Sequence, residues 1–220
     1  MLNFILAESA LELVPKEIWR HPAVASDARR REAEPGAILL DRSFHHSAMT
    51  RLKDTEKRGR PDLVHVALLS VTGTPLYLDG KVRVTVHLST GSVVEIAEKT
   101  RIPKSYLRFR GLMEKCLVER PESGLLAVKE RSFKELIREA RPGRTIGLSV
   151  RGKQVGLGRL GSEAASLKDP CVVIGGFPHG HFAPEVEERL DELVRIDPRP
   201  LEAHVVAARV IYEIEKAAGG

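Results

Sequence analysis

Hydrophobic and polar positions along the chain predict strands that alternate with helices. In Val82–Leu88, valines and a leucine alternate with arginine, threonine and histidine, which is typical of a strand with one face on a core and one in water. Leu63–Val71 is almost continuously apolar and follows a Gly-Arg-Pro-Asp turn, which favours a buried strand of a parallel sheet. Cys171–Ile174 has the same character over a shorter stretch. Strands that alternate with helices indicate an α/β fold.

Helical spacing and helix-boundary residues predict where the helices lie. Tyr106–Val118 gathers its large apolar residues on one side. Ser132 and Glu135 form a capping box for the helix Phe133–Ala140. Further helices are expected over Ser43–Lys53 and Pro184–Val194. A last helix is expected to about Lys216, with Pro200 in its first turn. Further strands are expected over Leu125–Val128 and Thr145–Val150.

Composition narrows the class of protein. The chain has 220 residues, of which 42% are hydrophobic and 30% charged, so collagen-like, disordered and coiled-coil classes are excluded. No apolar run approaches the roughly 20 residues of a membrane helix, so no membrane partner is expected. Met1–Leu6 is apolar but lacks a basic region, and Glu8 follows at once, which argues against a secretory signal. Cys116 and Cys171 lack zinc-type spacing and are expected to be reduced core thiols, in the cytoplasm or another reducing compartment.

A basic excess suggests a polyanionic partner only where the charge is concentrated. Lys and Arg number 35 and Asp and Glu 30, which gives a net charge of +5. Lys99–Arg110 holds five basic residues and no acidic one. If Pro103 precedes a helix, Lys104 and Arg108 share its outer face and can contact successive phosphates, with Tyr106 or Phe109 available for stacking. The alternative is a solvated face, although such faces normally mix signs.

Two turns are candidate ligand sites. Gly175–His181 follows a buried strand and precedes a helix, a setting in which backbone N–H groups face a ligand. It is not GxGxxG, so a nicotinamide site is not favoured, and a tight structural turn remains the alternative. Before Leu63, the carboxylate of Asp62 can hold Arg60 as a fixed cation aimed at an anion. The alternative there is a surface ion pair in a turn.

The histidines do not predict a metal site. His45 and His46 are adjacent and point apart on a helix, and His179 and His181 have no obvious third ligand. His45 and His46 therefore make a poor metal pair, His179 and His181 are expected to be polar turn residues, and no metal is predicted.

Three segments in order resemble one family, the SPOUT-class pseudouridine-N1-methyltransferases of ribosome biogenesis, whose eukaryotic members are called nucleolar essential protein. The segments are RGRPDLVH at 58–65, TRIPKSYLRFRGLM at 100–113 and VIGGFPHG at 173–180. The first two are specific and the third is looser. The short N-terminus is similar to that of archaeal members.

The resemblance implies an α/β-knot fold. Residues 1–220 would form one domain, a parallel sheet flanked by helices, with a C-terminal deep trefoil knot and a basic RNA-binding extension around residues 72–130. Sequence pattern alone does not predict such threading, because connections rarely thread loops. The family's members form homodimers through the knot region, with RNA in a basic groove across the dimer.

The resemblance also assigns candidate site residues. S-adenosylmethionine would be bound by Leu148, Gly175, Gly180, Ile196, Asp197, Pro198, Arg199, Pro200 and Leu201. The small-subunit rRNA would be bound by Arg60, Arg101, Lys104 and Arg108, where a lysine at 104 replaces bidentate binding with a point charge. Arg60 and Asp62 are the implied catalytic pair, with Asp62 either orienting Arg60 or acting as a base, although pairing with Arg60 makes it a poor one.

The implied reaction is methylation of N1 of a pseudouridine in a loop of 16S rRNA, with a role in small-subunit biogenesis. The target base must leave its stack to reach the methyl donor. Other ribosome assembly factors are further candidate partners. Two alternatives stay open: a non-catalytic rRNA-binding assembly factor and a nucleotide-dependent oxidoreductase.

Overall fold

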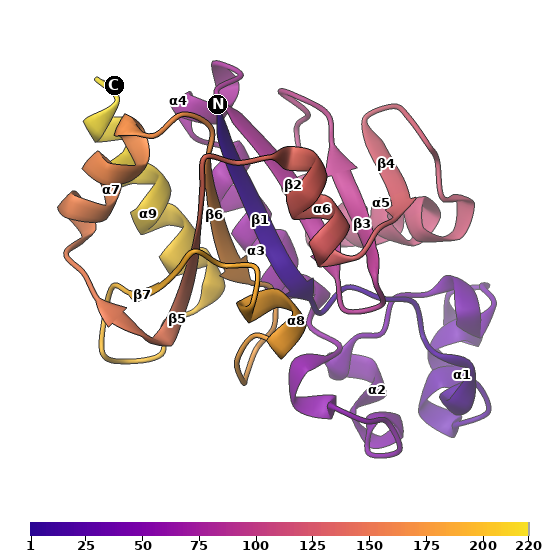
Figure 1. The fold of residues 1–220 in the computed structure, drawn as a ribbon. Helices are drawn as coiled ribbons and strands as arrows, with labels where there is room; N and C mark the ends of the chain where they lie inside the picture. The colour runs from indigo at the N-terminus through magenta and orange to yellow at the C-terminus, as the bar shows by residue number, and fades with distance from the viewer. Residues whose placement is uncertain (220) are drawn as a thin grey trace.

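The computed structural model describes residues 1–219, in which a seven-stranded sheet carries helices on both faces (Figure 1). The strand order is β4-β3-β2-β1-β6-β5-β7. The strands are β1 Leu2–Ser9, β2 Val82–Leu88, β3 Ser92–Ile96, β4 Leu126–Glu130, β5 Arg144–Gln154, β6 Pro170–Gly175 and β7 Glu192–Arg195. The longer helices are α1 Pro22–Arg30, α2 Arg42–Met49, α3 Pro61–Thr72, α5 Tyr106–Glu119, α6 Phe133–Ala140, α7 Leu157–Ser166 and α9 Ala203–Ala217, and the short ones are α4 Pro75–Leu78 and α8 Pro184–Glu187.

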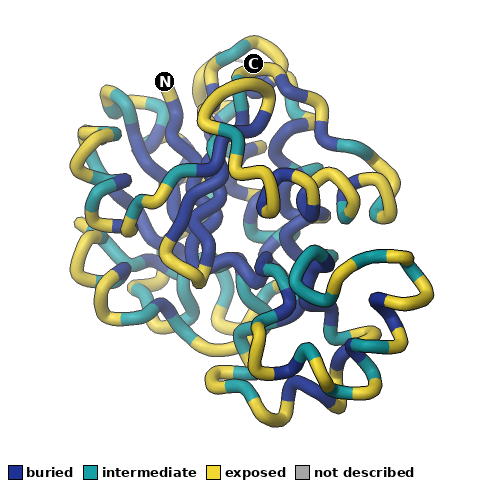
Figure 2. Tube along the Cα trace, turned by 90° about the vertical axis from the view of Figure 1, so that its right-hand side faces the viewer, coloured by how far each residue is buried: buried dark blue, intermediate teal, exposed yellow. Residues whose placement is uncertain are grey.

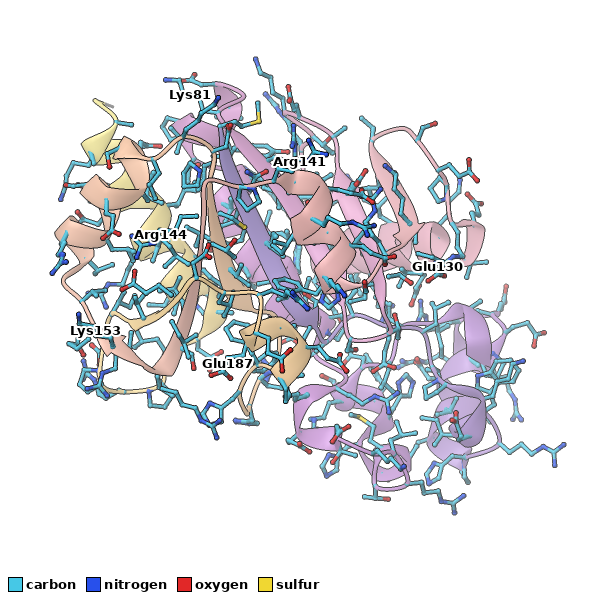
Figure 3. The ribbon with its side chains drawn as sticks, viewed as in Figure 1. Lys81, Glu130, Arg141, Arg144, Lys153 and Glu187 are labelled. Carbon is cyan, nitrogen blue, oxygen red and sulfur yellow. The ribbon has the colours of Figure 1, made fainter. Side chains whose placement is uncertain are left out.

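The sheet is parallel over β2, β1, β6, β5 and β7, and β3 and β4 extend it by antiparallel pairing. The predicted α/β fold is therefore confirmed. At the start of β5, Arg144 donates a hydrogen bond to Glu192 at the start of β7 (2.8 Å) and also pairs with Glu163 of α7 (Figure 3). These contacts align the two parallel strands at their amino ends.

Both faces of the central strand β1 are buried, which explains the apolar run Phe4–Ala7 at its centre. Leu2, Phe4 and Leu6 face a core that includes residues of α3, α5 and α9. Ile5 and Ala7 face a second core that includes residues of α6 and α8. The buried strands lie in the interior of the trace in Figure 2. Burial of this kind contributes roughly 25 cal/mol per Å² of apolar surface.

Residues 10–59 form a separate lobe, called here the N-terminal lobe. The chain leaves the sheet after β1, builds this lobe and rejoins the main body at α3. The lobe has its own apolar core, which includes Ile18, Val24 and Met49. It stands beside the main body, with α1 and α2 at the lower right of Figure 1.

The strand predicted at Leu63–Val71 is wrong, because these residues belong to helix α3. Pro61 occupies the first turn, where its missing N–H leaves no hydrogen bond unmade. The helix packs against α9 and α5 and is buried on most sides, so it shows no polar face in the sequence. A short apolar run does not by itself distinguish a buried helix from a buried strand.

The helix predicted at Pro184–Val194 is also wrong beyond Glu187. Glu192–Arg195 forms the edge strand β7, which pairs with β5. Pro200 lies ahead of α9, which begins at Ala203, rather than in its first turn. Here pairing to a distant strand decides the structure and overrides the local helical spacing.

Val82–Leu88 is a strand, as predicted, but the face that was predicted to be exposed to water is mostly buried. Arg83 is exposed, whereas Thr85 and His87 are buried. The ring of Phe133, at the start of α6, meets His87 edge-on at 5.4 Å between centroids. Burial lowers the pKa of His87 to about 4, so this histidine is a neutral core residue.

Several local predictions are confirmed. The capping box at Ser132 and Glu135 begins α6, and Tyr106–Val118 lies within α5. Cys116 and Cys171 are free and buried. None of the helices in residues 1–219 combines the length and the apolar composition that crossing a bilayer requires.

Candidate functional site

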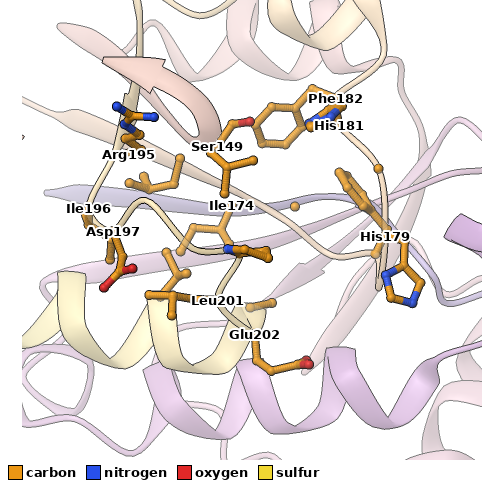
Figure 4. A pocket seen from close by; sticks show the side chains of 18 of the residues that line it. Ser149, Ile174, His179, His181, Phe182, Arg195, Ile196, Asp197, Leu201 and Glu202 are labelled. Carbon is orange, nitrogen blue, oxygen red and sulfur yellow. The ribbon is translucent and has the colours of Figure 1, made fainter. Parts of the chain in front are cut away.

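A cavity of about 500 Å³ opens at the carboxyl ends of β6 and β7 and beside the middle of β5 (Figure 4). Parallel strands place their carboxyl ends at one edge of a sheet, and this edge is where ligands bind in open α/β folds. Three segments far apart in the sequence line most of the cavity: residues 148–150, 174–182 and 194–203, with Gly176 and Pro198 not among the lining residues. The cavity lies in the size range of about 300–1,000 Å³ that is typical of small-molecule sites.

Eight of the nine residues predicted to bind the cofactor line this cavity. They are Leu148, Gly175, Gly180, Ile196, Asp197, Arg199, Pro200 and Leu201. Pro198 is the ninth and is not among the lining residues. Tertiary structure therefore brings the three predicted loops together around one space.

The cavity has apolar walls and a polar rim. Leu148, Ile174 and Val194, from three neighbouring strands, are buried beneath it. On the rim, Arg199 donates two side-chain hydrogen bonds to Asp197, at 2.9 and 3.0 Å, and its backbone N–H donates a third at 3.0 Å. These bonds hold the pKa of Asp197 below its usual range and fix the turn after β7. An apolar interior with few placed polar groups suits a planar ring system with polar edges.

An ion pair between a buried glutamate and a half-buried lysine fastens the glycine-rich loop to the rest of the molecule. Glu8 follows the body of β1 in a left-handed conformation (φ 51°), and its carboxylate accepts a hydrogen bond from Lys57 Nζ at 2.7 Å. The same carboxylate accepts the backbone N–H of Ala183 at 2.6 Å, and Lys57 also donates to the carbonyl of His181. The Lys57 ammonium lies 4.6 Å from the ring centroid of Phe177. The Glu8–Lys57 pair thus fixes both ends of the loop that closes one side of the cavity.

A glycine is required where this loop meets β1. The backbone N–H of Gly176 donates to the carbonyl of Ala7 at 2.7 Å, and its carbonyl accepts from Ala10 at 2.8 Å. A Cβ at position 176 would lie 2.2 Å from Ser9 Oγ. The loop therefore reaches β1 as closely as it does because residue 176 has no side chain.

Arg60 and Asp62 form a bidentate pair at the start of α3. Arg60 donates from Nε and from a terminal nitrogen to the two oxygens of Asp62, at 2.8 and 2.9 Å. Burial acts to raise the pKa of Asp62, but the hydrogen bonds and charge of Arg60 outweigh it, and the pKa is lowered. The hydrogen bond to Asp62 raises the pKa of Arg60. At neutral pH both groups are charged, and the guanidinium is held in one orientation.

The Arg60–Asp62 pair stands at the edge of the cavity. Leu63, the next residue, lines the cavity. Glu202 also lines it, and its negative charge contributes to the raised pKa of Arg60. The backbone N–H of Arg60 reaches the carbonyl of Ala10, just beyond β1, at 3.3 Å. The arginine predicted to meet the substrate and the loops predicted to bind the cofactor are therefore neighbours within one chain.

Arg101, Lys104 and Arg108 are exposed, and in the described part of the chain none of them makes an ion pair. Contacts to α3 hold their backbone: His65 shares a 2.7 Å hydrogen bond with the carbonyl of Pro103 and stacks on Phe109 at 4.4 Å. Three uncompensated cations on a fixed segment are suited to phosphate binding.

Tyr106 joins this basic segment to the N-terminal lobe. Its hydroxyl donates a hydrogen bond to Asp41 of the lobe, and its ring centroid lies 6.0 Å from that of His65 in α3. Burial, the bond to Asp41 and the charges of Asp41 and Asp62 all raise the pKa of the Tyr106 phenol. The phenol thus stays protonated and donates to Asp41.

Sequence reasoning missed several residues of the cavity. Ser149, Phe182 and Glu202 line it, and so do His179 and His181, which were expected to be ordinary turn residues (Figure 4). The glycine-rich pattern pointed to this loop but not to the side chains that face inward. Within residues 1–219 no group of His, Cys, Asp and Glu is arranged to hold a metal ion.

Comparison with known proteins gives one consistent result. A family model described as EMG1/NEP1 methyltransferase matches residues 4–215. The chain is 41% identical over 218 residues to the ribosomal RNA small subunit methyltransferase Nep1 of Thermococcus onnurineus, and 43% identical over 220 residues to that of Pyrobaculum neutrophilum, with 98% of each chain covered. The crystal structure of Archaeoglobus fulgidus Nep1 bound to S-adenosylhomocysteine superposes with a TM-score of 0.88, at 36% identity and 99% coverage of both chains.

Proposed function

The chain belongs to the EMG1/NEP1 methyltransferase family, and from this premise we propose that it methylates small-subunit rRNA with S-adenosylmethionine as the methyl donor. We propose further that the acceptor is N1 of a pseudouridine in a 16S rRNA loop. The observation that carries the proposal is the position of the Arg60–Asp62 pair at the edge of the three-loop cavity.

The cavity fits the cofactor on its own features. Its volume of about 500 Å³ and its apolar walls suit an adenine ring. Gly180, which lines the cavity, has a φ of 99°, a conformation that residues with a side chain rarely adopt, so a glycine shapes this part of the wall. We assign cofactor contacts to the loops around Leu148, Gly175–Gly180 and Ile196–Leu201. When bound there, S-adenosylmethionine supplies an electrophilic methyl group on a sulfonium sulfur.

Arg60 is assigned the electrostatic role. The N1 proton would pass to solvent water as the methyl group is transferred, and a fixed guanidinium beside the uracil ring would stabilise the negative charge that develops there. Because Asp62 holds Arg60 in place before substrate arrives, little reorganisation is needed during the reaction. The low pKa of Asp62 makes it a weak acceptor for the proton, so we assign it orientation of Arg60 rather than general-base catalysis.

The basic segment is assigned to RNA. Arg101, Lys104 and Arg108 would bind the phosphates around the target loop, so that the flipped base reaches the cavity. The extension around residues 72–130, which carries them, would act as the RNA-binding part of a single domain.

We propose that the protein is a homodimer, with RNA in a groove across the two protomers, and that its C-terminal segment forms a deep trefoil knot. It would act in the cytoplasm alongside other assembly factors. The knot accounts for the way residues 194–203 come to line the same cavity as residues 174–182. Sedimentation and small-angle scattering would test the dimer.

The decisive experiment measures transfer of a labelled methyl group to a pseudouridine hairpin and to the matched uridine hairpin. Only the pseudouridine hairpin should become labelled, at a single nucleotide. Equal labelling of both would overturn the assignment of N1. RNA binding that is unchanged by the cofactor, with no transfer, would instead support a non-catalytic assembly factor.

A further inference from the structure

We propose that Phe44, with Arg30 and Arg110 beside it, binds a nucleotide of the RNA loop next to the target base. The inference rests on the proposed function, because it extends the RNA surface from the basic segment onto the N-terminal lobe. It adds a stacking platform to a site so far described only by phosphate-binding cations.

Three side chains from three helices form this platform. Phe44 of α2 is 38% exposed. The Arg30 guanidinium, at the end of α1, lies 4.9 Å from the ring centroid of Phe44, and the Arg110 guanidinium, on α5, lies 5.9 Å from it. Arg30 is held by an ion pair with the buried Asp27 while its side chain stays 60% exposed.

Phe44 does not belong to the apolar core of the lobe, which is built from other residues, among them Ile18, Val24 and Met49. His45, the neighbouring residue, is the one that points inward and is fully buried. A large aromatic left at the surface between two cations is an arrangement that favours a ligand with a flat, electron-rich ring and negative charge.

The platform is continuous with the proposed RNA site. Arg110 lies on the same helix, α5, as Tyr106 and Arg108. The Tyr106 hydroxyl donates a hydrogen bond to Asp41, the N-cap residue of α2, and α2 carries Phe44. The platform therefore adjoins the basic segment through α5 and the start of α2.

The chemistry favours nucleic acid over a protein partner. In the described part of the chain Arg110 has no ion pair, and an apolar protein interface would bury its charge without compensation. A nucleotide instead offers a base to stack on the ring or on a guanidinium plane, and a phosphate to neutralise the arginines. We therefore assign the platform to a loop nucleotide other than the methylated one.

The test combines protein variants with RNA variants. The affinity of the full-length protein for the pseudouridine hairpin is measured for wild type, Phe44→Ala and Phe44→Leu, and for hairpins in which each loop nucleotide in turn is made abasic. Phe44→Ala should weaken binding by about 5- to 100-fold, the effect of one lost stacking contact, and Phe44→Leu should restore only part of it. One abasic position should weaken wild-type binding and have no further effect in Phe44→Ala.

Matched controls separate charge from stacking. Arg110→Ala should lower the salt dependence of binding by about one unit of slope. Lys16→Ala removes a cation of the N-terminal lobe that lies 5.9 Å from the ring centroid of Trp19. This variant should leave the salt dependence of RNA binding unchanged. Binding of S-adenosylhomocysteine and thermal unfolding should be the same in all these variants.

The outcomes distinguish this inference from the proposed function. Wild-type affinity in Phe44→Ala, together with weaker binding in Arg108→Ala, overturns the platform and leaves the proposed RNA site standing. Additive effects of Phe44→Ala and every abasic position also overturn it. Weaker binding in Phe44→Ala with the predicted abasic coupling, but no methyl transfer by wild type, supports the platform and refutes the proposed methylation.

Discussion

The Arg60 guanidinium and the Asp62 carboxylate face each other across two parallel hydrogen bonds, although only Pro61 separates them in the sequence. The pair is possible because Pro61 starts α3, so that Arg60 is the N-cap residue of the helix and Asp62 lies in its first turn. A carboxylate in the first turn is also favoured by the positive end of the helix dipole.

The first prediction concerns the separate roles of Arg60 and Asp62. Arg60→Ala should lower kcat by about 10²- to 10³-fold, as for loss of one preorganised donor, and leave the Kd of S-adenosylhomocysteine unchanged. Asp62→Asn should lower kcat less, since its amide can still accept one hydrogen bond from Arg60. Because the pKa of Asp62 is below its ordinary value of about 4, activity should not fall through its protonation above about pH 5. An acidic limb near neutral pH that disappears in Asp62→Asn would instead identify a general base.

The second prediction concerns the Glu8–Lys57 pair. Lys57→Met leaves Glu8 buried without its partner, so we expect a loss of about 3 kcal/mol or more in unfolding free energy and weaker binding of S-adenosylhomocysteine. The double variant Glu8→Gln with Lys57→Met should regain stability, because no unpaired charge remains, but its cofactor affinity should stay low. Lys53→Met, four residues away and exposed, is the control. Calorimetry and denaturant titration measure both effects, and full recovery of cofactor affinity in the double variant would argue against a positioning role.

The third prediction concerns the basic segment. Arg101→Ala and Arg108→Ala should each reduce the dependence of log affinity on log salt by about one unit, because each removes one phosphate contact. Lys168→Ala removes an exposed cation just before β6, at the opposite end of the strand from the cavity, and should bind as wild type does. Fluorescence anisotropy at several salt concentrations measures the slopes. If Arg101→Ala and Arg108→Ala both have the slope of wild type, as the control should, the RNA binds elsewhere.

The fourth prediction concerns the packing of α7 on α9. A Cβ at Gly161 would lie 2.5 Å from the backbone oxygen of Glu213, so Gly161→Ala should destabilise the fold by about 1–3 kcal/mol. Gly158→Ala lies in the same helix, where the nearest atom would be 3.7 Å away, and should be neutral or slightly stabilising. Thermal unfolding of the two variants checks this, and equal melting temperatures would contradict the close approach of the helices.

Local sequence signals predicted those elements whose structure depends on near neighbours. The capping box at Ser132 and the helix over Tyr106–Val118 are of this kind, and so is the juxtaposition of Arg60 and Asp62. The family resemblance then indicated which loops would gather, and eight of its nine cofactor positions do line one cavity.

Tertiary structure decided the rest, because burial and distant pairing act on residues that the sequence does not bring together. Leu63–Val71 can be a helix despite its nearly continuous apolar sequence, because α9 and α5 pack against it and most of its residues are buried. Glu192–Arg195 is a strand because β5 offers it an edge. The contact of Glu8 with Ala183 spans 175 residues, and no periodicity in the sequence predicts it. The sequence by itself determined which residues favour a helix, a turn or a fixed charge; only the folded chain decided which of them meet, since side chains distant in sequence interact only after the core has set their positions.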